Sequence, residues 1–219
     1  MHIPDGYLDL WIIGVCAIFS ILAIAISVIK LKNNFDDKQI STLAVLTAVV
    51  FAAQMINWPV GPGGTTAHLV GGALIAIFMG PFAAVISMTV ILLIQALIFN
   101  DGGILALGAN IFNMGVIDVF VGYLLFIATL RTIRDKKIAV LTGSFLAGWL
   151  GITTAAFACG VELGLSTIFP YEIGVSVAVM TIYHALLGLI EGAITAFAVF
   201  YVMKVRPDLI LTLKEVSIE

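Results

Sequence analysis

Residues 82–99 read FAAVISMTVILLIQALIF, eighteen residues without an acidic or basic side chain. An α-helix rises 1.5 Å per residue, so this stretch is about 27 Å long, close to the hydrocarbon thickness of a bilayer. The preceding pair, Gly80 and Pro81, ends any helix before it and permits a new one to begin. The stretch therefore predicts a membrane-spanning helix.

The whole chain has the composition of such a segment. Of its 219 residues, 62% are hydrophobic and 11% are charged, and the mean hydropathy is +1.18. These values exclude a soluble globular domain and indicate a polytopic membrane protein. Apolar runs predict an all-α bundle of seven transmembrane helices, near 9–29, 41–57, 65–80, 82–99, 104–130, 138–159 and 175–203.

The ten Lys and Arg residues predict the orientation of this bundle. They follow the first, the fifth and the seventh predicted spans, which places all of them on one side of the membrane. The loops on the other side carry no basic residue. By the positive-inside rule, we expect the N-terminus outside and the C-terminus inside.

The chain opens Met1-His2, and this pair can chelate a cation. The terminal amine, the backbone nitrogen of His2 and its Nδ1 close fused five- and six-membered rings around one ion. Three nitrogens in a plane suit Ni²⁺ or Cu²⁺ better than tetrahedral Zn²⁺. Pro4-Asp5-Gly6 predicts a turn that folds the first three residues back toward the protein.

His68 is the predicted fourth nitrogen donor. It lies near the outer end of the third predicted span, after a glycine-rich stretch. Three extended residues reach about 10 Å, so His2 meets His68 if the first span packs nearby. The alternative is a histidine hydrogen-bonded to a backbone carbonyl. Ionisable groups within membranes are costly and are usually functional.

The last predicted span contains two further ionisable residues, His184 and Glu191. They share one helical face, on which Gly188 and Gly192 form a small-residue strip for close helix packing. We expect His184 to pack or to orient other groups, with direct metal ligation as the alternative. A buried Glu191 must be paired, protonated or hydrated.

Several amide side chains lie in the predicted outer half of the bundle. Asparagine and glutamine can orient an imidazole through its second ring nitrogen, as metal sites usually require. For most of Gln95, Asn110 and Asn113 we expect hydrogen bonding between helices, with orientation of an imidazole as the alternative.

Other function classes lack their motifs. The glycines at Gly63 and Gly64 are not followed by Gly-Lys-Ser/Thr, so we expect no bound nucleotide, and no feature predicts nucleic-acid binding. A His-Glu-x-x-His helix is absent, so we do not expect an enzyme. A self-sufficient transporter with a proton path through Glu191 and Asp118 is the alternative, although no inverted repeat is visible. Cys16 and Cys159 are expected to be buried as small apolar residues.

Four stretches of this chain together carry a family pattern: MHIPDGY (1–7), GGTTAH (63–68), LGANIFNMG (107–115) and HALLGLIEG (184–192). They resemble the CbiM/NikM family, the substrate-binding S components of energy-coupling factor (ECF) transporters for Co²⁺ and Ni²⁺. The resemblance implies that Met1, His2 and His68 bind the metal. It also implies a single domain, 1–219, in which an extra N-terminal segment and helix (1–31) precedes a six-helix core (38–204).

The resemblance also implies partners. These are a transmembrane coupling subunit, ATP-binding cassette ATPase subunits and a small accessory membrane subunit, in the cell (inner) membrane of a prokaryote. Alanines spaced four apart at Ala44, Ala48 and Ala52 are a candidate docking face. The function we expect is high-affinity uptake of Ni²⁺, which a planar set of nitrogens favours over Co²⁺. A cobalt-specific component is the alternative.

Overall fold

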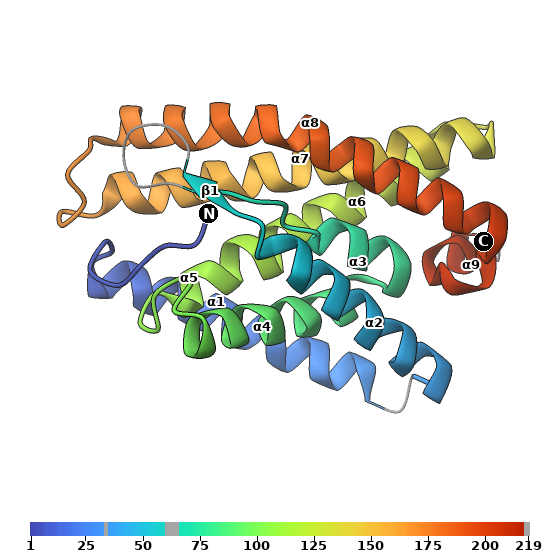
Figure 1. Cartoon of the computed structure of the whole chain (residues 1–219), viewed down its shortest axis with the longest axis horizontal. Helices are drawn as coiled ribbons and strands as arrows, with labels where there is room; N and C mark the ends of the chain where they lie inside the picture. The colour runs from blue at the N-terminus through green and yellow to red at the C-terminus, as the bar shows by residue number, and fades with distance from the viewer. Residues whose placement is uncertain (33–34, 60–65, 217–219) are drawn as a thin grey trace.

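The computed structural model describes residues 1–32, 35–59 and 66–216, and this part of the chain is almost entirely helical (Figure 1). The all-α expectation is confirmed, with one addition. Strands β1 (Trp58–Pro59) and β2 (Thr66–Ala67) form a two-residue antiparallel ladder. The helices are α1 (Leu10–Leu31), α2 (Asp37–Gln54), α3 (Gly72–Met79), α4 (Pro81–Ile98), α5 (Leu107–Asn110), the π-helix η1 (Ile111–Ile117), α6 (Asp118–Thr132), α7 (Lys136–Leu165), α8 (Ile173–Val205), the 3₁₀ turn η2 (Pro207–Leu209) and α9 (Leu211–Val216).

Five helical segments in the described ranges are long and apolar enough to cross a membrane. They are α1, α4, the continuous run Leu107–Thr132, α7 and α8, which match five of the seven predicted spans. The second predicted span corresponds to α2, whose 18 residues begin with Asp37 and Lys38 and are less apolar. The count of seven spans is therefore not confirmed.

The third predicted span, 65–80, is wrong in length. Its helix, α3, has eight residues, about 12 Å of helix, and cannot cross a bilayer. Gly71 precedes this helix in a left-handed conformation (φ 73°), and Gly80 ends it with φ 83°. Both conformations are ordinary for glycine and break a helix at either side. The first residue of this predicted span, Thr65, lies outside the described residues, as do the preceding Gly63 and Gly64.

The basic segments gather at one end of the molecule, where the C-terminus lies (Figure 1). Lys38 Nζ lies 2.6 Å from the Asp208 carboxylate and so joins the start of α2 to η2. Lys137 and Lys204 both lie over the ring of Phe200, at 5.6 Å and 4.6 Å. The common side that the sequence predicts for these residues thus corresponds to a common end of the bundle. Which end faces the cytoplasm stays a prediction.

Helices α7 and α8 lie side by side and pack through glycines (Figure 1). A Cβ added at Gly192 would lie 2.6 Å from the carbonyl oxygen of Phe145, and one at Gly188 would lie 2.9 Å from that of Trp149. These distances leave no room for a larger residue, so the backbones of the two helices approach closely. This is the packing that the small-residue strip predicts.

Candidate metal centre

The N-terminal segment folds back into the bundle instead of extending into solvent. Ile3 is 2% exposed, and its N–H donates to Asn110 Oδ1 at 2.8 Å. Asn110 Nδ2 donates in turn to the Ile3 carbonyl at 3.1 Å, and Gly103 N–H donates to the same oxygen at 2.9 Å. One asparagine side chain therefore satisfies both backbone groups of Ile3 and fixes the two residues that precede it.

The predicted turn at Pro4-Asp5-Gly6 is present, with Gly6 at φ 85°. The Asp5 carboxylate accepts hydrogen bonds from three consecutive backbone N–H groups, those of Ile104, Leu105 and Ala106. These donors lie just before α5, so the turn is attached to the same segment of chain that holds Ile3.

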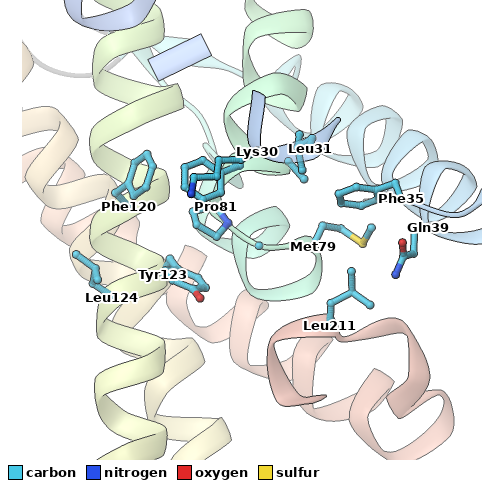
Figure 2. A pocket seen from close by; sticks show the side chains of 13 residues that line it. Lys30, Leu31, Phe35, Gln39, Met79, Pro81, Phe120, Tyr123, Leu124 and Leu211 are labelled. Atoms are coloured by element: carbon cyan, nitrogen blue, oxygen red, sulfur yellow. The ribbon is translucent and has the colours of Figure 1, made fainter. Parts of the chain in front are cut away.

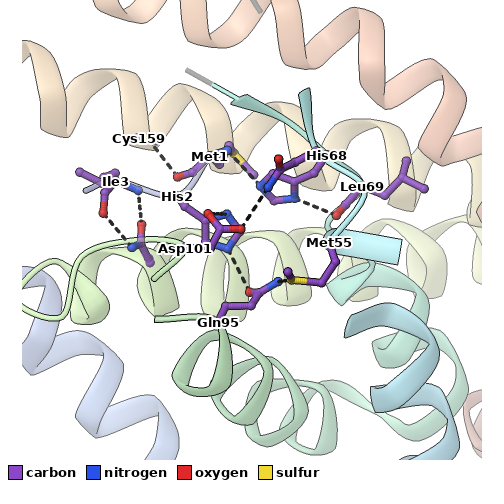
Figure 3. Close-up of polar contacts among 11 residues, drawn as sticks. Met1, His2, Ile3, Met55, His68, Leu69, Gln95, Asp101 and Cys159 are labelled. Carbon is purple, nitrogen blue, oxygen red and sulfur yellow. Dashed lines mark hydrogen bonds and ion pairs between the residues drawn. The ribbon is translucent and has the colours of Figure 1, made fainter. Parts of the chain in front are cut away.

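This fold brings Met1 and His68 together (Figure 3). The terminal amine lies 3.1 Å from His68 Nε2, and the two residues are 2% and 1% exposed. His68 Nδ1 lies 2.9 Å from the Leu69 carbonyl oxygen, which can only accept, so we assign the ring proton to Nδ1. The lone pair of Nε2 is then directed at the amine.

His2 is oriented by Gln95. Its Nε2 lies 3.0 Å from Gln95 Oε1, so we assign the ring proton to Nε2. Its Nδ1 is buried and has no hydrogen-bond partner among the residues that the structure describes. The Asp101 carboxylate oxygen Oδ1 lies 3.4 Å from this Nδ1. The His2 and His68 rings stack with centroids 4.6 Å apart.

Burial favours the neutral forms of these donors. Desolvation lowers the pKa of the Met1 amine from 8.0 to about 6, despite the opposing effect of nearby acidic groups. Desolvation and the neighbouring terminal amine lower the pKa of His2 to about 4. At neutral pH the amine and the imidazole thus carry lone pairs that a metal ion can accept.

The loop that carries His68 is held by two buried carboxylates. Glu191 accepts from the N–H groups of Val70 (2.9 Å) and Gly71 (2.7 Å), and Asp118 accepts from Ala73 at 3.0 Å. Both carboxylates therefore bind backbone donors at the start of α3. They are the two groups of the alternative proton path, and the structure pairs them with the His68 loop.

The remaining predicted residues contact other groups. His184 Nδ1 lies 2.8 Å from the carbonyl of Met180, one turn earlier in α8. Asn113 donates to Glu162 at 2.7 Å, and Cys16 donates to the same carboxylate at 3.3 Å. Cys159 is buried with its Sγ 4.0 Å from the Met1 carbonyl oxygen. Both cysteines are unbridged, as expected.

Sequence reasoning missed Asp101 and Glu162, and it placed Asp5 in the turn without predicting its bonds to residues 104–106. Asp101 and Asp5 each stand next to glycine on the predicted outer side, the side of His2, and this shared side was the available signal. Glu162 lies just after the predicted end of the sixth span, where an acidic residue is expected to face water.

The described part of the chain contains no group of three or more His, Cys, Asp or Glu side chains that could hold a metal ion. The candidate site depends instead on the terminal amine and a backbone nitrogen. A cavity of about 590 Å³ lies far from it, near the basic end (Figure 2). It is formed by the end of α1, the α3–α4 junction, α6 and α9, and Lys30 lines it.

Comparison with known proteins gives the family. Residues 2–209 match the profile of CbiM, described as a cobalt uptake substrate-specific transmembrane region. The chain belongs to the CbiM family. As a CbiM-family protein with several apolar helices able to cross a bilayer, it is a multi-pass membrane protein.

Relatives of this CbiM-family chain are metal transport proteins. A protein of Archaeoglobus fulgidus, provisionally named as a fused nickel transport protein NikMN, is 50% identical over 96% of this chain and 68% of its own length. The cobalt transport protein CbiM of Sorangium cellulosum is 31% identical over 100% of this chain and 98% of its own. A crystal structure of a truncated transition metal transporter superposes with a TM-score of 0.86 at 38% identity, over 93% of this chain and 99% of that one.

Proposed function

We propose that this chain is the substrate-binding S component of an ECF transporter and that it takes up Ni²⁺. Its nickel- and cobalt-transporting relatives support uptake of one of these ions. The observation that carries the site is the 3.1 Å approach of the Met1 amine to His68 Nε2, with Nδ1 of His2 buried beside them and lacking a hydrogen-bond partner.

In this proposal four nitrogens surround the ion. The Met1 amine, the His2 backbone nitrogen and His2 Nδ1 form the chelate, and His68 Nε2 completes the plane. The hydrogen bonds of His2 to Gln95 and of His68 to Leu69 leave the required ring nitrogens unprotonated. An all-nitrogen plane favours Ni²⁺ over Co²⁺. Cobalt remains the second candidate, because the family profile and the Sorangium relative are both described by cobalt.

The sharpest test changes the terminus and leaves every side chain in place. Acetylation of Met1 converts the amine to an amide and supplies no new terminal amine, so the chelate loses the group that anchors it. We expect Ni²⁺ affinity to fall at least 100-fold, as in His2→Ala and His68→Ala. Wild-type affinity in the acetylated protein would exclude the amine as a ligand. An absorption band of square-planar Ni²⁺ in the wild type, absent from His68→Ala, would support the four-nitrogen plane.

We further propose that the energy for transport comes from ATPase subunits through a coupling subunit. A groove of about 480 Å³ between α2 and α4 supports a docking site for that subunit. Two of the three alanines of the predicted face, Ala44 and Ala48, line this groove with Leu43, Phe51 and Val90, whereas Ala52 does not. Small side chains there allow a partner helix to approach closely.

Transport in proteoliposomes tests the coupling. We expect this chain alone to bind Ni²⁺ without accumulating it in the vesicles. Accumulation should require the coupling subunit and the ATPase subunits, with ATP on the side of the membrane where the ATPase subunits lie. Uptake by the chain alone, driven by a pH gradient, would refute the S-component proposal and favour the self-sufficient transporter. Ala48→Leu should abolish assembly with the coupling subunit and leave Ni²⁺ affinity unchanged.

A further inference from the structure

Asp101 lies in the loop between α4 and α5 and is fixed from two sides. Its backbone N–H donates to the Gln95 carbonyl oxygen at 2.9 Å, and its Oδ2 accepts from Asn57 Nδ2 at 3.1 Å. Gln95 is also the residue whose side chain orients the His2 ring. The same element therefore positions the carboxylate and the imidazole relative to each other (Figure 3).

The second oxygen of Asp101 faces the candidate metal site. Its Oδ1 lies 3.4 Å from His2 Nδ1. Because Nε2 of His2 is the protonated nitrogen, Nδ1 and Oδ1 present lone pairs toward one another. Two acceptors at this distance repel unless a cation or a proton lies close to both. The arrangement is thus unfavourable for the neutral ring alone and favourable for an approaching cation.

The donors of the site differ in their access to solvent. The side chain of Asp101 is 19% exposed, whereas that of His2 is 2% exposed and His68 is 1% exposed. An ion arriving from solvent meets the carboxylate before it meets the nitrogens. Carboxylate oxygens bind hydrated divalent cations readily, and a charge placed at a site's mouth raises the association rate.

We propose that Asp101 is the capture ligand of this site: its carboxylate binds the hydrated cation first and transfers it to the four nitrogens of Met1, His2 and His68. This inference rests on the proposed function of those nitrogens. It assigns Asp101 a role in the rate of loading, and it leaves the dissociation rate of the loaded site to the nitrogens, so the dissociation constant changes only through association.

The experiment measures the kinetics of Ni²⁺ binding to the full chain in detergent by stopped-flow absorbance. Asp101→Asn removes the charge and keeps an oxygen that can accept from Asn57. Asp9→Asn is the matched control, because Asp9 lies at the same end of the bundle but accepts from Thr167 and not from a candidate ligand. Both substitutions change the net charge equally.

We expect Asp101→Asn to slow association about tenfold at low ionic strength. Dissociation should stay within twofold of wild type, with an unchanged Ni²⁺ spectrum. Asp9→Asn should change neither rate by more than twofold. Added salt should slow wild-type association and have less effect on Asp101→Asn.

Two results would overturn the inference. One is an Asp101→Asn association rate equal to that of Asp9→Asn. The other is faster dissociation with an altered spectrum, which would make Asp101 a permanent ligand. The His2→Ala variant separates this failure from failure of the proposed function. Normal Ni²⁺ binding by His2→Ala would refute the four-nitrogen site itself, whereas lost binding with normal Asp101→Asn kinetics would refute only the capture role.

Discussion

The carboxylate of Glu191 accepts a 2.7 Å hydrogen bond from the backbone N–H of Gly71. The two residues are 120 positions apart, and Glu191 is only 3% exposed. Because Gly71 lies three residues after His68, this bond connects the centre of α8 to the loop that presents the proposed fourth donor. The position of His68 therefore depends on a residue outside the proposed set of nitrogen donors.

Glu191→Gln is expected to weaken Ni²⁺ binding about tenfold or more. An amide has one oxygen, so only one of the two N–H groups of Val70 and Gly71 keeps an acceptor, and a buried donor left without one costs about 1–3 kcal/mol. Calorimetric titration measures the change. Glu172→Gln, the same substitution at the exposed start of α8, is the control and should bind normally.

A double-mutant cycle with His68→Ala tests whether Glu191 acts through that histidine. If it does, Glu191→Gln adds little further loss once His68 is absent. Fully additive losses in the double variant would contradict the positioning role.

The pH dependence of Ni²⁺ affinity should have two slopes. Chelation removes the proton of the His2 backbone nitrogen at any pH, so the dissociation constant should rise about tenfold for each unit by which pH falls. Below the pKa of the Met1 amine, about 6, a second proton must also leave, and the rise should approach 100-fold per unit. Titrations between pH 5 and pH 8 measure both slopes. A flat profile above pH 6.5 would show that the backbone nitrogen stays protonated.

Asn110→Ala should weaken Ni²⁺ binding by roughly 10- to 100-fold. The substitution leaves the N–H of Ile3 without its acceptor, at a cost of about 1–3 kcal/mol, and releases the segment that carries Met1 and His2. Faster hydrogen exchange at Ile3 should accompany the loss. Asn113→Ala is the matched control, since Asn113 binds Glu162. Equal losses of affinity in the two variants would argue against a specific role of Asn110.

Gly192→Ala should destabilise the protein by about 1–3 kcal/mol, because its Cβ would lie 2.6 Å from the Phe145 carbonyl oxygen and force α7 and α8 apart. Gly174→Ala in the same helix is the control: no atom lies within 4 Å of its added Cβ. It should be neutral or slightly stabilising, because alanine favours helix more than glycine does. Thermal unfolding in detergent compares them, and equal melting temperatures would contradict the packing argument.

Much of this architecture is visible in the sequence, because apolar length alone specifies α1, α4, α7 and α8. The exception is α3. The sequence around it is apolar enough to suggest a membrane span. Hydropathy does not reveal that Gly71 adopts a left-handed backbone conformation, which breaks the helix there. Burial of α3 inside the bundle also makes it look like a segment in contact with lipid, since both environments select apolar residues.

The sequence predicts which residues form the candidate site where residue type and the predicted side of the membrane are enough to identify them. Met1, His2 and His68 do lie together, and Gln95 and Asn110 do hold the N-terminal residues. Asn110 and Asn113 could not be distinguished by spacing. The π-helix η1 begins at Ile111, and its wider turns change the direction in which Asn113 points.

In the proposed site the free amine of Met1 is itself a ligand, so the position of that amine becomes part of the recognition of the ion. Because the amine lies 3.1 Å from His68 Nε2 and the residue is 2% exposed, several residues added before Met1 would displace the amine from His68. Translation from an upstream start, or a tag fused at this end, would then yield a folded protein that cannot load its cargo. The choice of translation start would then determine whether the protein can bind and transport the ion.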